Sequence, residues 1–242
     1  WATGTINATA ITGVSGTASA IAALASASGI DLPTGGYTIT VTGTLAPSDV
    51  AELDAMNGAG TLDYTGATLT GTAAVLAANA GGYVTSGTDV LVTGAINMAD
   101  AATIQGLIVA GTQTVTAFSD TAANIAAVTA DGALVVAANA TATITITDGD
   151  ISVANAILLD ADTTGVVTAT ITEGGLTTLN TLTDANGNNA FTIVVTDTTL
   201  VDPADLTAVD GLTSVIVDAT AVVSLSGTAA DIDALLGDDV TL

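Results

Sequence analysis

The sequence contains no lysine, no arginine and no histidine, whereas 24 of its 242 residues are Asp or Glu, so the formal net charge is -24 at pH 7. Without a positive side chain the protein cannot neutralise the phosphates of a nucleic acid, and we exclude nucleic acid as a partner. The same composition disfavours anionic membrane surfaces and removes every conventional side-chain salt bridge. Stability must therefore come from apolar burial and backbone hydrogen bonds, to which bound cations could add.

Cysteine is also absent, which excludes disulfides and thiolate metal sites. Without His, Lys, Arg or Cys the chain has no ordinary general base near neutral pH and no cationic group to hold an oxyanion. A carboxylate pair, as in glycoside hydrolysis, is the remaining catalytic arrangement. However, the candidate pairs lie in turn sequences and lack the aromatic platform of a sugar site. We therefore predict that the protein is not an enzyme.

Long apolar runs are missing as well. No stretch reaches the roughly 18 apolar residues of a membrane-spanning helix, so the sequence predicts no membrane span. Apolar residues nevertheless make up 49% of the chain, which is typical of a folded protein and not of a disordered one.

A short phrase recurs along the chain. In each copy a Thr is placed to cap a helix N-terminus, and apolar residues follow three apart on one face. In the last copy Asp231 stands three residues after Thr228, which is the spacing of a capping box. Helices this short are unstable alone in water, so each must pack against a neighbour. The close copies are SGTASAIAAL (Ser15–Leu24), SDTAANIAAV (Ser119–Val128) and SGTAADIDAL (Ser226–Leu235), and a looser copy, TGTAAVLAAN, begins at Thr70.

A second pattern precedes the caps. Strand-like runs end in an apolar residue, a Thr or Ser, and then a Gly, Asp or Glu that we call the repeat mark. Successive repeat marks are separated by roughly 23 to 30 residues, a period typical of solenoid proteins. The nine repeat marks are Gly16, Gly43, Gly71, Gly94, Asp120, Asp148, Glu173, Asp197 and Gly227.

These two patterns predict the fold. Each period contains one helix and one strand, and strands separated by a helical crossover pair in parallel. We expect an elongated α/β solenoid of about nine helix-plus-strand coils with a parallel sheet, forming one repeat array over residues 1–242. A segment cut from a longer array is an equally weighted interpretation of the sequence ends. The expected core includes Ile21, Leu24, Val50, Leu53, Ile125, Val128, Val153, Ile157, Leu206, Val209, Ile232 and Leu235.

Clustered oxygen ligands make calcium the one cofactor that the sequence favours, because hard cations bind Asp, Asn and backbone carbonyls. In TDANGNN the side chains of Asp184, Asn186 and Asn188 alternate as at the start of an EF-hand loop, but Val195 stands where the bidentate Glu belongs. Asp148 with Asp150 and Asp160 with Asp162 are further candidates. The alternative for every cluster is a set of Asx turns and helix caps without metal.

Threonine alternates with Ile, Val or Ala in several strand-like runs, which places the hydroxyls on one sheet face. If neighbouring runs lie in register, these hydroxyls form a flat exposed array that could bind ice or a polysaccharide. Solvent-facing Thr is also common in ordinary strands. The runs are Thr38–Thr42, Thr114–Thr116, Thr143–Thr147 and Thr168–Thr172.

The phrases SGTAxxIxAL and SDTAANIAAV, with strands such as TITITDG between them, resemble the Ala-, Thr-, Asp- and Gly-rich repeats of very large secreted bacterial surface proteins. These include S-layer-like proteins and adhesins exported by type I secretion. The resemblance covers most of the chain, although the glycine-rich calcium nonapeptides frequent in such proteins are absent. It implies an extracellular, cell-surface location and a structural or adhesive role, with no catalytic residue.

Two functions therefore remain open from the sequence. The first is a structural subunit of a surface layer, sheath or fibre, whose copies associate head to tail. The second is a calcium-dependent adhesion module that binds glycans.

Overall fold

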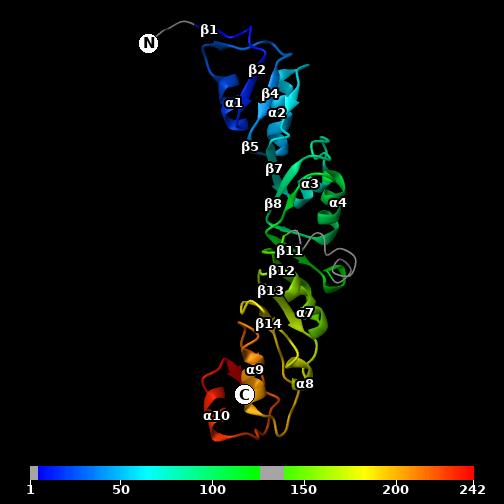
Figure 1. The fold of residues 1–242 in the computed structure, drawn as a ribbon, viewed down its shortest axis with the longest axis vertical. Helices are drawn as coiled ribbons and strands as arrows, with labels where there is room; N and C mark the ends of the chain where they lie inside the picture. The colour runs from blue at the N-terminus through cyan, green and yellow to red at the C-terminus, as the bar shows by residue number, and fades with distance from the viewer. Residues whose placement is uncertain (1–4, 126–138) are drawn as a thin grey trace. The chain divides into compact units, whose positions relative to one another are not determined.

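In the computed structural model, which describes residues 5–125 and 139–242, the protein is a mixed α/β fold with parallel sheets (Figure 1). The chain divides into two compact units. The first contains Trp1–Gly94 and Ala99–Val115, and the second contains Ala95–Met98 and Thr116–Leu242. The predicted parallel pairing of strands is confirmed, because every strand pair described is parallel.

The first unit contains three parallel sheets, whose strand orders are β1-β3, β2-β4-β6 and β5-β7-β8-β10. Helices α1, α2 and α3 connect strands that pair with one another. The strands are β1 (Ile6–Asn7), β2 (Gly13–Gly16), β3 (Ile30–Asp31), β4 (Thr38–Val41), β5 (Gly43–Leu45), β6 (Leu62–Asp63), β7 (Ala67–Thr72), β8 (Asp89–Thr93) and β10 (Gln113–Thr114). The helices are α1 (Ala18–Ser26), α2 (Pro47–Asn57), α3 (Ala73–Ala78) and α4 (Met98–Ile108), whose first residue belongs to the second unit.

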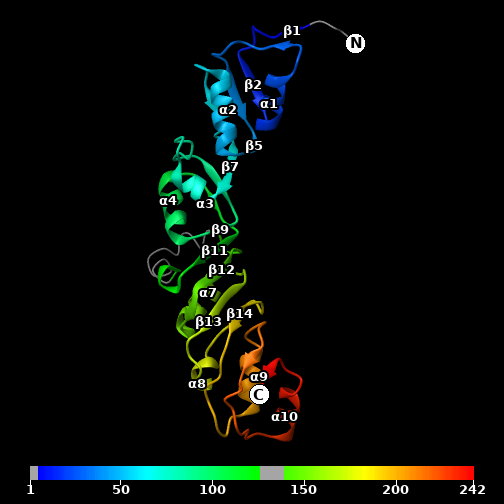
Figure 2. The same ribbon diagram turned by 180° about the vertical axis from the view of Figure 1, so that it is seen from behind.

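The second unit is built around one larger parallel sheet of order β14-β13-β12-β11-β9, and β15 pairs with β16. Helix α7 lies beside β12 and β13 in both views (Figures 1 and 2). The strands are β9 (Ala95–Ile96), β11 (Ala117–Asp120), β12 (Thr143–Ile151), β13 (Val167–Ile171), β14 (Ala190–Thr192), β15 (Val217–Asp218) and β16 (Val240–Thr241). The helices are α7 (Val153–Asp162), α8 (Leu176–Leu179), α9 (Pro203–Asp210) and α10 (Ala229–Leu235).

The core of each unit lies between the inward face of its strands and the apolar side of its helices. Ile39, Val41 and Ile144 on the strands and Leu206 on α9 are fully buried. The alternating Thr of the same strands point outward, and none of the predicted outward Thr is buried. Period-two patterning therefore determines which face of each strand is covered.

Most of the expected core positions are buried. Leu24 and Ile157 are half-buried, and Val128 lies outside the described residues. The prediction for Ile232 is wrong, because its side chain is 38% exposed. Helix α10 packs mainly against α9, and among its residues Leu235 is buried by this contact, whereas Ile232 stays partly open to solvent.

The predicted caps begin several of the helices. Thr17 Oγ1 accepts a hydrogen bond from the Ala20 N–H, and the expected capping box of Thr228 with Asp231 is present. Thr72 occupies the same position before α3 but makes no side-chain cap bond.

Within the described parts of the chain, no helix combines the length and the apolar character needed to cross a lipid bilayer.

Candidate functional site

Four acidic repeat marks bind the N-terminus of a helix that precedes them in the chain. Each carboxylate accepts a hydrogen bond from the backbone N–H of the first helical residue, 20 to 26 residues earlier. A helix cannot satisfy this N–H internally, and its N-terminus attracts negative charge. The pairs are Asp120 with Met98 (2.9 Å), Asp148 with Ala122 (2.8 Å), Glu173 with Val153 (2.9 Å) and Asp197 with Leu176 (2.7 Å).

Strand register explains why the repeat marks reach these atoms. Leu45 pairs with Leu69, so that Gly71 stands opposite Pro47, the first residue of α2. In the same way the bridge between Val201 and Leu225 places Gly227 opposite Pro203, the first residue of α9. Proline has no N–H to satisfy, and in both cases the opposite repeat mark has no carboxylate.

The close approach at Gly227 also excludes a side chain. A Cβ atom there would lie 2.7 Å from Cδ of Pro203. The two helices that begin with proline, α2 and α9, therefore lie opposite a glycine repeat mark. The four helices whose first backbone N–H donates to a carboxylate lie opposite an acidic repeat mark. The starts of α1 and α3, Ala18 and Ala73, have a free N–H but stand opposite Gly43 and Gly94, whose φ angles of +81° and +79° favour glycine.

Sequence reasoning identified all these positions as repeat marks but missed their role. The sequence contained a signal for this role. Helices α2 and α9 begin with proline, and the repeat mark opposite each of them is a glycine and not an acidic residue. The matching requires strand register, which the spacing of the repeat marks alone does not define.

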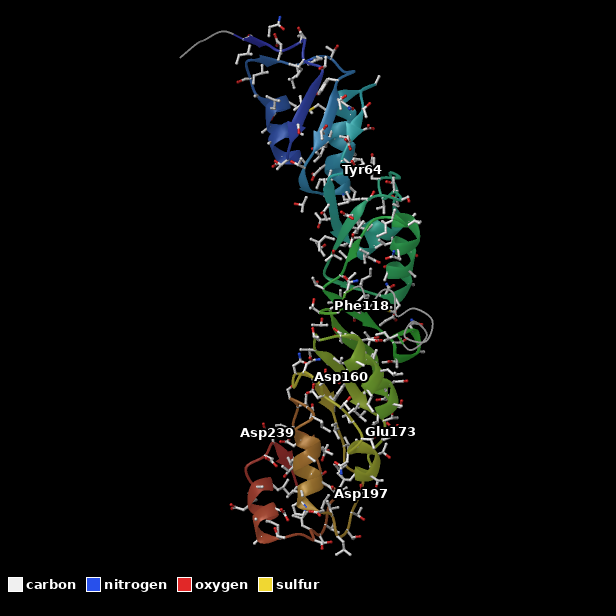
Figure 3. The ribbon with its side chains drawn as sticks, in the orientation of Figure 1. Tyr64, Phe118, Asp160, Glu173, Asp197 and Asp239 are labelled. Atoms are coloured by element: carbon white, nitrogen blue, oxygen red, sulfur yellow. The ribbon has the colours of Figure 1, made fainter. Side chains whose placement is uncertain are left out.

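The most buried carboxylate among the predicted metal ligands is Asp160, which is 4% exposed (Figure 3). Its Oδ1 accepts a 2.8 Å hydrogen bond from the Asn189 side-chain amide, and its Oδ2 accepts from the Ala185 N–H at 3.0 Å and from the Thr183 hydroxyl at 3.2 Å. Asn189, fully buried, also donates to Oδ1 of Asp184 at 3.1 Å. The structure therefore brings Asp160 and Asp184 together through an asparagine that the sequence analysis did not select.

The remaining residues of the TDANGNN stretch turn towards the preceding strand connection. The side-chain amide of Asn186 donates to the Thr163 carbonyl at 3.3 Å, and that of Asn188 donates to the Thr164 carbonyl at 3.0 Å. Asp184 accepts from the backbone N–H groups of Asn188 and Asn189. These contacts are Asx-turn and loop-to-loop hydrogen bonds. They occupy the carboxylate oxygens of Asp184, whereas Asn186 and Asn188 donate through their amide nitrogens and Oδ1 of Asn188 is buried without a hydrogen-bond partner.

The members of the other predicted pairs make different contacts, although Asp160 and Asp162 line one surface hollow. Asp148 binds the Ala122 N–H, whereas exposed Asp150 lies beyond a register shift in β12 and pairs in the ladder with Thr170. Asp162 is half-buried, and this burial raises the pKa of its carboxyl above the ordinary value. Asp160, Asp162 and Asn186 line a surface hollow of about 230 Å³.

Across the described residues no group of three or more Asp, Glu, His or Cys is arranged to hold a metal ion. Asp160 and Asp184 already accept hydrogen bonds from protein donors, and a cation would have to displace them. The calcium sites therefore stay a prediction.

The outward hydroxyls of the sheets lie in register on neighbouring strands. Thr145 pairs with Thr168 and Thr170 pairs with Thr192 in the second unit, and Thr72 pairs with Thr93 in the first. Adjacent strands are about 4.8 Å apart, so these pairs form short rows of hydroxyl groups on each sheet.

Comparisons with known proteins leave the chain without an assigned family: no protein family, no curated protein and no solved structure matches it.

Proposed function

We propose that the protein is a structural repeat subunit, or a segment of one, in an extracellular surface layer, sheath or fibre. In this proposal the two units are parts of one solenoid of about nine helix-plus-strand coils. The chain resembles the repeats of large secreted bacterial surface proteins, and that resemblance is the reason for placing it outside the cell.

The observation that carries the proposal is the recurrent pairing of segments one period apart. Strand pairs such as Gly13 with Thr38 and Thr168 with Ala190, and the carboxylate bonds to helix starts, join each segment to the next. In a repeat array each segment is stabilised chiefly by its neighbours, and such arrays serve as scaffolds and extended binding surfaces.

The chemistry of the surface supports association between copies through apolar contacts. Two copies with only negative side chains cannot form ion pairs with each other, so their interface must rely on apolar burial and backbone pairing. Large apolar side chains are well exposed in the second unit: Leu200 is 75%, Val223 is 76% and Leu236 is 76% exposed.

Sedimentation velocity and negative-stain electron microscopy over a range of concentrations test the proposal. We expect concentration-dependent oligomers or fibres, and fewer of them when Leu200 and Leu236 are replaced by Asp. Ala154→Asp combined with Ala204→Asp, at exposed positions on α7 and α9, is the control for the two added charges. A protein that stays monomeric at every concentration, with calcium or with chelator, would refute self-association.

The Thr rows favour a second candidate, a module that binds glycans. Thr145, Thr168, Thr170 and Thr192 present hydroxyl groups side by side on one sheet. A glycan array probed with calcium and with chelator tests this candidate and its calcium dependence. Binding that survives replacement of all four Thr by Val would show that this face is not the site.

A further inference from the structure

Three acidic repeat marks of the second unit, Asp120, Glu173 and Asp197, each bind the first N–H of a helix that is not adjacent in sequence. Glu173 and Asp197 are labelled in Figure 3. We propose that they form an acid-sensitive device. When ionised they hold the helix starts at Met98, Val153 and Leu176, and protonation loosens these starts. The starts at Ala18 and Ala73, which stand opposite glycine, do not respond.

The geometry supports a role for charge at each contact. The three donor–acceptor distances are 2.9, 2.9 and 2.7 Å, within the range of well-formed N–H···O hydrogen bonds. When the acceptor is an ionised carboxylate, such bonds are roughly twice as strong as neutral ones. Protonation removes the charge that favours the helix N-terminus.

Asp120 holds the largest number of donors. Its second oxygen accepts from the Thr121 N–H at 2.7 Å and from the Asn124 amide at 2.8 Å. Burial opposes its ionisation, but the hydrogen bonds from Asn124, Met98 and Thr121 outweigh burial and hold the pKa of the carboxyl below its ordinary value. The folded state therefore favours the charged form of this group.

The neighbouring charges act in the opposite direction. Because the chain has no basic residue, every charged side chain near the three marks is another carboxylate. Asp150 precedes α7, and Asp202 and Asp205 line a surface hollow with Asp197. Repulsion among like charges acts against the compact state of the whole chain. We therefore expect protonation of the three marks to loosen the helix starts locally, and this effect differs from a general loss of stability.

The test replaces the three carboxylates in the full chain by their neutral amides: Asp120→Asn, Glu173→Gln and Asp197→Asn. These side chains keep an acceptor oxygen and lose the charge. A matched control, Asp31→Asn, Glu52→Gln and Asp54→Asn, removes the same charge from three exposed residues. Amide hydrogen exchange by NMR at pH 7 measures local opening at Val153 and Leu176, with Ala18 and Ala73 as internal references.

We expect opening at Val153 and Leu176 to increase by roughly five- to thirtyfold in the test variant, and to remain unchanged in the control. In the wild type, the amide proton shift of Met98 should titrate as the Asp120 carboxyl protonates, below the ordinary range of an Asp because the pKa of this carboxyl is lowered. If the test and control variants exchange alike, or if the Met98 amide shift does not titrate, the proposal is wrong. Neither result depends on whether the protein self-associates.

Discussion

The side-chain amide of Asn189 donates a 2.8 Å hydrogen bond to Oδ1 of Asp160, and both residues are buried. Asp160 has no cationic partner, since the chain contains none. A buried carboxylate without a counter-ion is stable only when its oxygens are hydrogen-bonded, and Asn189 supplies one of these bonds from the period that follows.

Replacing Asn189 by Leu should lower the free energy of unfolding by about 2–5 kcal/mol, because it leaves a buried carboxylate short of a donor. The matched control is Asn180→Leu, which removes an amide bond of 2.9 Å to Asp205 at an exposed site and should cost within about 0.5 kcal/mol. Urea denaturation measures both. Equal losses in the two variants would show that burial of Asp160 is not decisive.

A second prediction concerns the close approach of backbones at Gly165. A Cβ atom at this position would clash with the carbonyl group of Ala142, so Gly165→Ala forces the strand connections apart. We expect a loss of about 1–3 kcal/mol, as for other overpacked sites. Gly87→Ala is the control, because nothing lies within 4 Å of the added methyl group. Thermal unfolding of the two variants compares them, and an unchanged melting temperature for Gly165→Ala would contradict the prediction.

The capping box of α10 gives a third prediction. Thr228 Oγ1 accepts from the Asp231 N–H at 3.3 Å, and Asp231 Oδ2 accepts from the Thr228 N–H at 3.0 Å. Thr228→Ala should cost about 0.5–2 kcal/mol. Thr72→Ala removes the N-cap Thr of α3, which makes no cap bond, and should cost less. Denaturant titration followed by circular dichroism measures the loss of unfolding free energy in both variants. A larger loss for Thr72→Ala than for Thr228→Ala would count against the cap.

Because the first residue of a helix and the opposite repeat mark must fit each other, we predict that the stability effects of substitutions at Pro203 and Gly227 are not additive. Gly227→Asp alone should destabilise, because its side chain meets Pro203. Combining it with Pro203→Ala removes the clash and creates an N–H opposite the new carboxylate. We expect the double variant to be more stable than the sum of the single changes by about 1 kcal/mol or more. A double-mutant cycle by urea denaturation measures this, and strict additivity would disprove the matching.

Asp162 gives a pH-dependent prediction. Burial raises the pKa of its carboxyl, so the folded chain binds this proton more tightly than the unfolded chain. The ionised group therefore destabilises the fold at neutral pH, and this penalty disappears as the pH falls through the raised pKa. Asp162→Asn should be more stable than the wild type at pH 7 and lose that advantage in acid. Unfolding measured across the pH range checks the sign; a destabilised variant at pH 7 would refute it.

The sequence predicted the local elements and the parallel pairing well, because caps such as Thr17 and Thr228 and the alternation of Thr with Ile or Val are local signals. It failed at Ile232, where exposure depends on how far α10 is covered by α9. The contact between Asp160 and Asn189 also could not be predicted, since it depends on which turn residues of successive periods come together. The roles of Asp120, Glu173 and Asp197 required strand register, which composition does not encode.

The opposition of Pro203 and Gly227 limits how such a chain can be rearranged. When the helix of one period begins with proline, the repeat mark of the next period must be glycine at the opposite position. When the helix begins with a residue that has a backbone N–H, an acidic repeat mark at that position stabilises it. Duplication or recombination that cuts between a helix start and the next repeat mark would join mismatched neighbours. Exchange of whole blocks that contain both a helix start and the next repeat mark would preserve the match. The segment that can be exchanged is therefore offset from the single helix-plus-strand period.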